Sequence, residues 1–198
     1  MGGGSVHRLR LLRQMMQASV IALLLPFAAS HAADQEFVDV TRHGDAVTVD
    51  ASATIRAPAL LIWETLTDYD HLAEFIPGMK RSHVIGRRGT VVTVEQEGEA
   101  SILGFGYPIR LVVEADELRP AAITVRMLTG NFRQFSGVYR VDKVAEGSFA
   151  LSWSGIVEPD ISLPPIIGTV LLRENIADQF LGLVREIERR EMRLRRKQ

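Results

Sequence analysis

The stretch LTDYDHLAEFIPGMKRSHVI, Leu66–Ile85, contains two aspartates, two histidines, a tyrosine and a Pro-Gly pair within twenty positions. Its composition supports two interpretations. Aspartate, histidine and tyrosine are residue types that form catalytic acid–base clusters. The same residues also suit a corner, where a helix ends and the chain bends around the mouth of a cavity before it enters a strand. The patterns on either side of the stretch bear on the choice.

The residues before this stretch predict a strand and then a helix. From Val47 to Ile55, apolar and polar residues alternate, which is the period of a half-buried strand. Pro58 suits the first turn of a helix, because the N–H that proline lacks would have no partner there. Ile62 and Leu66 follow at helical spacing, and we expect the helix to end near Thr67.

The residues after the stretch predict a run of strands with no helix between them. Six strand-like segments occupy Ser82–Glu158, and turn residues separate them at short intervals. Clear turn signals lie at Arg88-Gly89, at Arg119-Pro120 and at 145–147, where the sequence reads AEG. This spacing indicates an antiparallel meander, in which each strand pairs with the next.

The C-terminal segment predicts one long helix. It opens with Pro164-Pro165, and the thirty-odd residues from Pro165 would extend for about 45 Å. Its expected apolar face consists of Val170, Ala177, Phe180, Leu181, Val184 and Ile187. One strand, a pair of short helices, six strands and this helix together predict an α+β fold, in which a curved seven-stranded antiparallel sheet wraps around the C-terminal helix and leaves a cavity between them.

The first 32 residues differ from the rest of the chain. Three arginines precede the apolar run ASVIALLLPFAAS, and Ser30 and Ala32 are small residues before an expected cleavage point. This is the layout of a secretory signal peptide, and the run is shorter than a membrane-spanning helix requires. We therefore expect export to the periplasm or the exterior, with 33–46 as a polar lead-in to a domain at 47–191.

Composition excludes several classes of function. The 198-residue chain has no cysteine, which excludes disulfides, thiolate nucleophiles and cysteine metal sites. Lys and Arg number 23, against 24 Asp and Glu. Without the three arginines of the expected signal peptide, 20 basic residues face 24 acidic ones, a net charge of −4. A mildly acidic domain is a poor candidate for binding nucleic acid, which needs a basic face.

Three segments carry a resemblance to a known family. They are APALLIWETLTDYDHLAEFIPGMKRSHVI at Ala57–Ile85, FSGVYRVDKV at 135–144 and LSWSGIVEPDISLPP at 151–165. With them, the chain from Val47 to Glu191 resembles the START-like helix-grip (SRPBCC) superfamily, in its polyketide cyclase/dehydrase and coenzyme-Q-binding branch. The resemblance implies a seven-stranded sheet around a C-terminal helix, with a deep apolar pocket. Members bind lipids, quinones, polyketides or hormones, and a minority are enzymes.

The resemblance favours the corner over the acid–base cluster. It implies that the first helix ends at Asp68, that HLAEF forms a second short helix, and that Ile76-Pro77-Gly78 turns the chain into the next strand. Asp68 or Asp70 would then cap a helical turn by accepting backbone N–H bonds. Phe75 and Ile76 would pack inward.

Strand and helix periodicity selects the residues expected to face the cavity. Small residues among them would leave room for a ligand, and Gln96, Tyr139 and the Trp153 indole would be its polar groups. The alternative is a filled core, in which Tyr139 and Trp153 only find backbone partners. The candidate ligand-binding residues are Val94, Gln96, Gly98, Ile109, Leu111, Val125, Met127, Phe135, Gly137, Tyr139, Trp153, Val170, Arg173, Ala177, Phe180 and Leu181.

Signals for chemistry are weak. No His, Asp or Glu falls on the expected concave face, whereas an enzyme needs a titratable group there. None of the three histidines outside the expected signal peptide has metal-ligand spacing, and G-x-S-x-G does not occur. We expect no metal, cofactor or catalytic residue. Glu95, Glu97 and Glu99 share one face of a strand, where a solvated surface is favoured over a cation site.

Two basic features have alternative interpretations. Arg173 lies on the expected inner face of the long helix, where an ion pair with a neighbouring strand is favoured over contact with a ligand's carboxylate or carbonyl. Residues 192–198 form a basic tail that complements the helix dipole. Its alternative role is peripheral contact with an anionic membrane, with Met192 and Leu194 as apolar contacts.

These observations predict a monomeric, exported binding or carrier protein. Its ligand would be a hydrophobic small molecule, such as a lipid, a quinone or a polyketide-like compound, held between the sheet and the C-terminal helix. A cyclase or dehydratase-type enzyme that uses the same pocket is the alternative.

Overall fold

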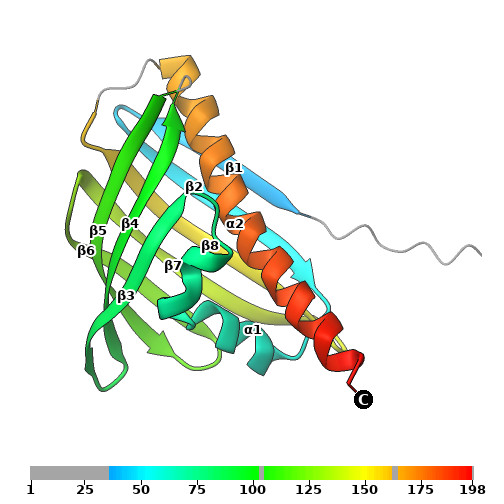
Figure 1. Cartoon of the computed structure of the whole chain (residues 1–198). Helices are drawn as coiled ribbons and strands as arrows, with labels where there is room; N and C mark the ends of the chain where they lie inside the picture. The colour runs from blue at the N-terminus through cyan, green and yellow to red at the C-terminus, as the bar shows by residue number, and fades with distance from the viewer. Residues whose placement is uncertain (1–35, 103–104, 162–164, 198) are drawn as a thin grey trace, which may run out of the picture. The chain divides into compact units, whose positions relative to one another are not determined.

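A curved antiparallel sheet and one long helix dominate the fold (Figure 1). The computed structural model describes residues 36–102, 105–161 and 165–197. The strands are β1 (Phe37–His43), β2 (Ala46–Ile55), β3 (Met79–Arg88), β4 (Val91–Ile102), β5 (Phe105–Leu118), β6 (Ala122–Gly130), β7 (Phe132–Ala145) and β8 (Ser148–Pro159). The helices are α1 (Ala59–Leu66), the 3-10 helix η1 (Tyr69–Glu74) and α2 (Pro165–Arg195).

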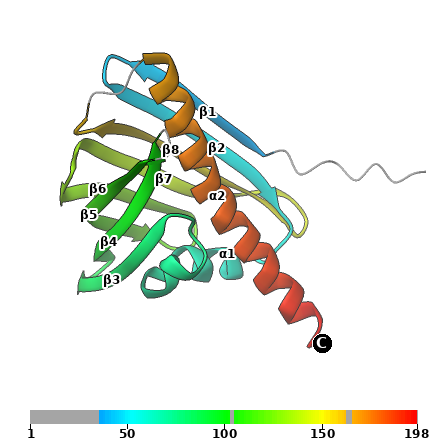
Figure 2. The same cartoon turned by 45° about the horizontal axis from the view of Figure 1, so that its top comes forward.

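The sheet is a single layer with the strand order β1-β2-β8-β7-β6-β5-β4-β3. Every neighbouring pair is antiparallel, so β3 to β8 form the expected meander and β2 adds to its last strand. In Figure 1 and in the turned view of Figure 2, the sheet bends around α2, while α1 and η1 cover the end of the sheet near the C-terminal half of α2. The predicted α+β helix-grip fold is confirmed.

The sheet has eight strands where seven were expected. The additional strand, β1, lies within the expected polar lead-in and pairs with β2 from Phe37↔Ser52 to His43↔Ala46. Val38 and Val40 pack against the core, and their neighbours Phe37, Asp39 and Thr41 are exposed. An alternation with only two inward valines is too short to predict a strand from the sequence. The strand is stabilised by its pairing with β2.

Much of the packed core lies at the α1 end of the molecule. Ile55, Ile62, Leu151 and Ile187 are fully buried where β2, α1, β8 and the C-terminal half of α2 meet. Helix α1 ends at Leu66, as expected. A Cβ added to Gly182 would lie 2.5 Å from Pro77 Cδ, so a residue without a side chain is needed where α2 meets the turn after η1.

Ion pairs, rather than helix caps, hold the corner between α1 and β3. Asp68 makes no capping bond; its carboxylate accepts hydrogen bonds from His71 Nδ1 at 2.6 Å and from Arg190 Nη2 on α2 at 2.8 Å. Asp70 accepts the backbone N–H of Val84 on β3 at 2.8 Å. The expected cap is therefore wrong, because the two carboxylates bond to side chains of η1 and α2 and to a backbone N–H of β3, and not to backbone N–H groups of the adjacent turn.

The same network continues along α2. Glu186 is buried and accepts hydrogen bonds from Arg189 and Arg190, and the Arg190 guanidinium lies 5.4 Å from the centre of the Phe75 ring. Burial alone would raise the pKa of Asp68 and of Glu186, but the hydrogen bonds from these cations and from His71 outweigh it and lower both pKa values. Charged groups thus join η1 to the last third of α2.

The outer face of the sheet is charged, as expected. Arg81 on β3 donates to Glu95 and Glu97 at 2.9 Å each, and Lys80 donates to Glu99 at 2.6 Å. Helix α2 continues to Arg195, so most of the expected basic tail is helical. No described helix combines the length and the hydropathy of a bilayer-spanning segment. The expected signal peptide, residues 1–32, lies outside the described residues.

Candidate functional site

A cavity of about 230 Å³ separates α2 from the concave face of the sheet. Apolar side chains of β4 to β8 form one wall, and Leu172, Ile176, Phe180 and Leu183 of α2 form the other. The sheet curves too strongly for the side chains of one helix to fill the space beneath it. Its volume is somewhat below the range of about 300–1,000 Å³ of most small-molecule pockets, which favours a slender ligand.

The structure brings ten of the sixteen predicted site residues together. They line the cavity from six elements, β4 to β8 and α2, and the strand parity assumed for the nine residues on the sheet is correct. These ten are Val94, Gln96, Gly98, Ile109, Leu111, Val125, Phe135, Tyr139, Trp153 and Phe180.

Four of the other six lie on α2 and do not border the cavity. Val170 is 51% exposed, and Ala177 and Leu181 do not border the cavity. Arg173 is exposed and donates from Nε to the Val38 carbonyl at 3.1 Å, so it meets neither an acid nor the cavity. The prediction followed a seven-residue spacing, which drifts around a straight helix by about 20° per heptad.

The residues of α2 that do line the cavity follow the true helical period. Counting back from Ile187 in steps of three or four residues leads to Leu183, Phe180, Ile176 and Leu172, and all four border the cavity. Their neighbours Asn175 and Gln179 add two amide side chains to the lining. The sequence contains this signal, but the buried end of the helix must be known before the count can start.

The remaining two predicted residues, Met127 and Gly137, face inward but do not border the cavity. A Cβ at Gly137 would lie 2.8 Å from the Trp153 ring, so the indole occupies the space that the glycine leaves. The Met127 sulfur would be 3.0 Å from a Cβ on Gly130 and packs there instead. Small residues on the sheet therefore mark close contacts in this case, and not room for a ligand.

An aromatic row runs along the sheet side of the cavity. The Phe132 and Phe135 rings meet edge to face at 5.8 Å between centroids. Trp153 follows, 6.4 Å from Phe135 and 6.2 Å from Tyr139. Burial raises the pKa of Tyr139 to about 12, so its hydroxyl remains protonated. The row offers flat apolar surface along the cavity with a phenol at its inner end.

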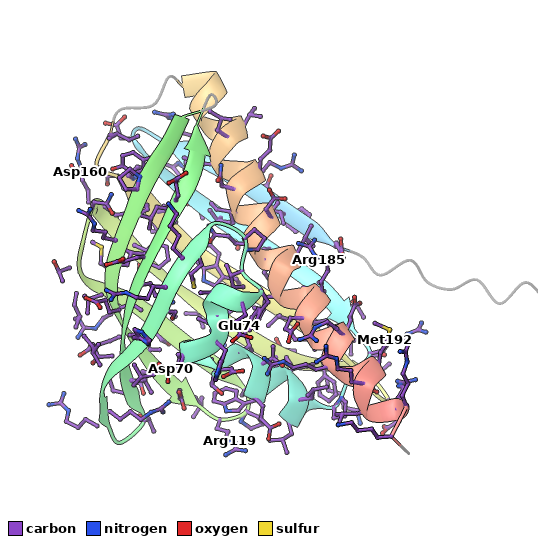
Figure 3. All side chains as sticks on the ribbon, viewed as in Figure 1. Asp70, Glu74, Arg119, Asp160, Arg185 and Met192 are labelled. Atoms are coloured by element: carbon purple, nitrogen blue, oxygen red, sulfur yellow. The ribbon has the colours of Figure 1, made fainter. Side chains whose placement is uncertain are left out.

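The two ends of the cavity differ. In Figure 3, Asp160, which directly follows β8, labels the end of the molecule away from α1, and Arg119 labels the end where α1 lies. Near Asp160, the lining residues Tyr107 and Phe132 are only partly buried, and Asn131 holds Tyr107 in place by donating to its hydroxyl at 3.2 Å. This outer end is the less covered one.

At the α1 end, packed side chains close the cavity. Leu66, Tyr69, Leu72 and Ile123 line it, and each is at most 9% exposed. Beside Tyr69 lies Glu117, which shares the inward parity of Leu111 to Ala115 and has a side chain that is only 18% exposed. The expectation that no acid would fall on the concave face is therefore wrong, because the β5 alternation was not followed to its end.

The arrangement of a curved sheet, a gripped helix and an apolar cavity defines the helix-grip class of START-like proteins. A family model described as polyketide cyclase / dehydrase and lipid transport matches residues 46–188. This chain belongs to that family, and its fold is that of the START-like superfamily. Among curated proteins, no sequence matches significantly.

Solved structures agree with this assignment at the level of the fold. The Zhui aromatase/cyclase from Streptomyces sp. R1128 superposes with a TM-score of 0.61 at 21% identity, over 73% of this chain and 95% of that one. A START superfamily protein from Mycobacterium smegmatis gives 0.59 at 14% identity, over 74% and 98%. Major latex-like protein 151 from Panax ginseng gives 0.53 at 17%, over 75% and 99%.

Proposed function

We propose that this protein is an exported carrier that holds one hydrophobic small molecule in the cavity between the sheet and α2. The observation that carries the proposal is the cavity itself, with its aromatic row and its few polar groups. Unfilled space costs stability, because the side chains around it lose dispersion contacts. A fold that keeps such space beside a well-packed core is suited to a ligand that completes the packing.

Family membership supports a hydrophobic ligand. The family description names both cyclase or dehydrase activity and lipid transport, and carriers of the second kind need only shape and apolar surface. The export part of the proposal rests on the sequence of residues 1–32. N-terminal sequencing of the protein from the periplasmic fraction should begin near Ala33; an intact Met1 on cytoplasmic protein would contradict export.

A catalytic role is the second candidate, and one observation favours it. Tyr69 places a titratable group at the α1 end of the cavity, with Glu117 beside it, where a cyclase or dehydratase would need one. Native mass spectrometry separates the two functions, because a carrier returns a bound compound unchanged. Extraction of the copurifying ligand, followed by incubation with fresh protein, should leave its mass and its chromatographic retention unaltered; a change in either would establish turnover, since a ring closure without loss of water changes only the retention.

Binding can be followed through Trp153, which lines the cavity. The only other tryptophan, Trp63, lies in the core on α1, so a Trp63→Phe background isolates the signal. We expect a saturable change in Trp153 emission on titration with an apolar probe. If no apolar probe alters the emission and no compound copurifies with the protein, the carrier function fails.

A further inference from the structure

Two amide side chains line the cavity without making a hydrogen bond. Gln96 lies on β4 and Gln179 on α2, and neither amide has a partner among the described residues. The Tyr107 hydroxyl and the Asn175 amide, which also line the cavity, each take part in such a bond. A primary amide carries two N–H donors and one carbonyl acceptor, and leaving them unused in a poorly solvated space lowers stability. The two free amides are therefore candidates for contact with a ligand.

The Gln96 side chain points to the concave side of the sheet. Val94, two residues earlier on the same strand, is fully buried, and Leu111, directly opposite on β5, borders the cavity. Ser82 lies opposite Gln96 on β3 and is 1% exposed, and its hydroxyl has no partner in the part of the chain that the structure describes. Since residues opposite each other in an antiparallel pair share a face, Gln96 and Ser82 form a small polar patch on the inner side of the sheet.

Both amides flank the turn between η1 and β3. On the helix side, a Cβ on Gly182 would lie 2.5 Å from the proline of this turn, and Gln179 lies one helical turn before Gly182. On the sheet side, a Cβ on Gly98 would lie 2.7 Å from a carbonyl oxygen of the same turn, and Gln96 is two residues before Gly98 on the same face. Helix α2 and β4 also contact each other directly. The amides thus reach the cavity beside one turn, one from the helix wall and one from the sheet wall.

The cavity lining lacks a cation. Among the described residues that border the cavity, there is no Arg, Lys or His, and the single acid, Glu97, accepts a hydrogen bond from Arg81 at 2.9 Å on the outer face. A charged group of a ligand would enter this apolar space with nothing to neutralise it, which is strongly unfavourable. The polar group that meets the two amides should therefore be uncharged.

We propose, on the basis of the carrier function above, that Gln96 and Gln179 form a recognition site for an uncharged carbonyl group of the ligand. A carbonyl oxygen has two lone pairs, so it can accept one N–H from the sheet wall and one from the helix wall. The apolar remainder of the ligand lies along the aromatic row. The ligand class is a slender ketone, ester or amide.

A carbonyl oxygen fits this site better than other polar groups do. A carboxylate brings a charge for which the lining has no counterion. A hydroxyl brings a proton of its own, so one amide must turn its oxygen, and not its N–H, toward the ligand. The site therefore selects uncharged carbonyl compounds over fatty acids of the same length.

The test compares three probes with the same eight-carbon chain: 2-octanone, octanoate and 1-chlorooctane, which accepts hydrogen bonds only weakly. Affinities for the full-length protein are measured at neutral pH through Trp153 emission in the Trp63→Phe background. We expect 2-octanone to bind at least about tenfold more tightly than octanoate. Equal affinities for these two probes would overturn the carbonyl site and leave the carrier function intact. Failure of all three probes would overturn both.

Two variants remove one amide each and keep the length of the side chain. Gln96→Met and Gln179→Met should each weaken the binding of 2-octanone about fivefold or more, because one hydrogen bond is lost. The affinity for 1-chlorooctane should stay the same or rise, and so should the melting temperature of the free protein, since an unpartnered polar group is removed. Gln134→Met on β7, exposed and away from the cavity, is the matched control and should bind like the wild type.

Two outcomes with these variants would contradict the proposal. Equal changes in the affinities for 2-octanone and 1-chlorooctane would show that the amides shape the cavity without recognising a carbonyl. A lower melting temperature with unchanged affinity for 2-octanone would show amides with a structural role, satisfied by buried water. Either result would overturn the carbonyl site, and binding of 1-chlorooctane would still support the carrier function.

Discussion

The two halves of α2 perform different tasks within one continuous helix. From Phe180 to Ile187, the residues that face the sheet are almost fully buried and complete the core with β2, β8 and α1. From Leu172 to Gln179, the residues that face the sheet are only partly buried and border the cavity. The same helix thus acts as a core element at one end and as a cavity wall at the other.

The difference between the two halves follows from where the short helices α1 and η1 lie. At the α1 end, α1 and η1 fill the space between the sheet and the helix, and the pairs formed by Asp68, Arg190 and Glu186 lock them to α2. No corresponding helix lies between the sheet and the N-terminal half of α2 in the described chain (Figure 1). The space between the sheet and α2 is therefore filled beside α1 and left empty beside the N-terminal half of the helix.

The largest expected effect separates the two halves by stability. Ile187→Ala should reduce the free energy of unfolding by about 2–5 kcal/mol, because it opens a void in a closed core. Leu172→Ala should reduce it by less than about 1 kcal/mol, because this side chain already borders empty space. Urea denaturation of both variants measures the contrast. Similar losses at the two positions would mean that the halves are equally packed.

The second prediction separates the halves by binding. Ile176→Trp should fill the cavity and weaken the uptake of an apolar probe at least about tenfold, whatever the modest cost of overpacking. Val170→Trp on the exposed side of the same helix is the control and should bind like the wild type. Competition against a fluorescent apolar probe is suitable here, since the added indole complicates tryptophan emission. Equal weakening by both variants would point to a general disturbance of α2.

The third prediction concerns the charged hydrogen bonds of Asp68, which join the corner between α1 and β3 to α2. Asp68→Ala removes the bonds to Arg190 and His71, and with both partners partly exposed we expect a loss of about 1–2 kcal/mol. Probe affinity should change little, because Asp68 does not line the cavity. Thermal and urea unfolding measure the loss. Reduced affinity at an unchanged melting temperature would instead support the catalytic interpretation of this corner.

The fourth prediction is the pH dependence of the stabilisation from the hydrogen bond between Asp68 and His71. The hydrogen bond to Asp68 raises the pKa of His71. The stabilisation that this bond gives the folded protein is complete below the ordinary His pKa of about 6.5 and is lost as the pH rises through the raised pKa. The pKa of Asp68 is lowered, so the stabilisation from its ionised carboxylate is lost only as the pH falls below the ordinary Asp pKa of about 3.8. The bond therefore stabilises the folded protein most between about pH 3.8 and 6.5. His71→Gln should lower the melting temperature at pH 5.5 and leave it nearly unchanged at pH 9.

The smallest expected effect concerns the end of α2. Met192 and Leu194 are 54% and 44% exposed, and Arg193, Arg196 and Lys197 surround them. We expect weak, salt-sensitive binding to vesicles that contain anionic lipid, about 1 kcal/mol for each basic residue near the surface. Replacement of Arg196 and Lys197 by Gln should reduce cosedimentation at low salt. Binding that survives high salt, or that also occurs with neutral vesicles, would exclude this electrostatic contact.

The sequence by itself determined the class of fold, the meander and most of the sheet side of the cavity. Strand parity is local: each side chain points opposite to its neighbour, so Val94, Leu111 and Val125 could be placed inward without any knowledge of their partners. The same rule predicted the outward row of glutamates on β4. It would also have found Glu117, had the β5 alternation been followed beyond Leu111 to the end of the strand.

Tertiary structure alone decided which side of α2 faces the cavity, what Asp68 binds and where the empty space lies. A helix can rotate about its axis, and only its contacts with β1, β2 and α1 fix the rotation that brings Ile176 to the cavity and Val170 to the surface. Asp68 pairs with a residue 122 positions away, which no local pattern reveals. Empty space is a property of the distance between elements, and a small residue such as Gly137 predicts it only if no neighbouring ring has already filled the gap.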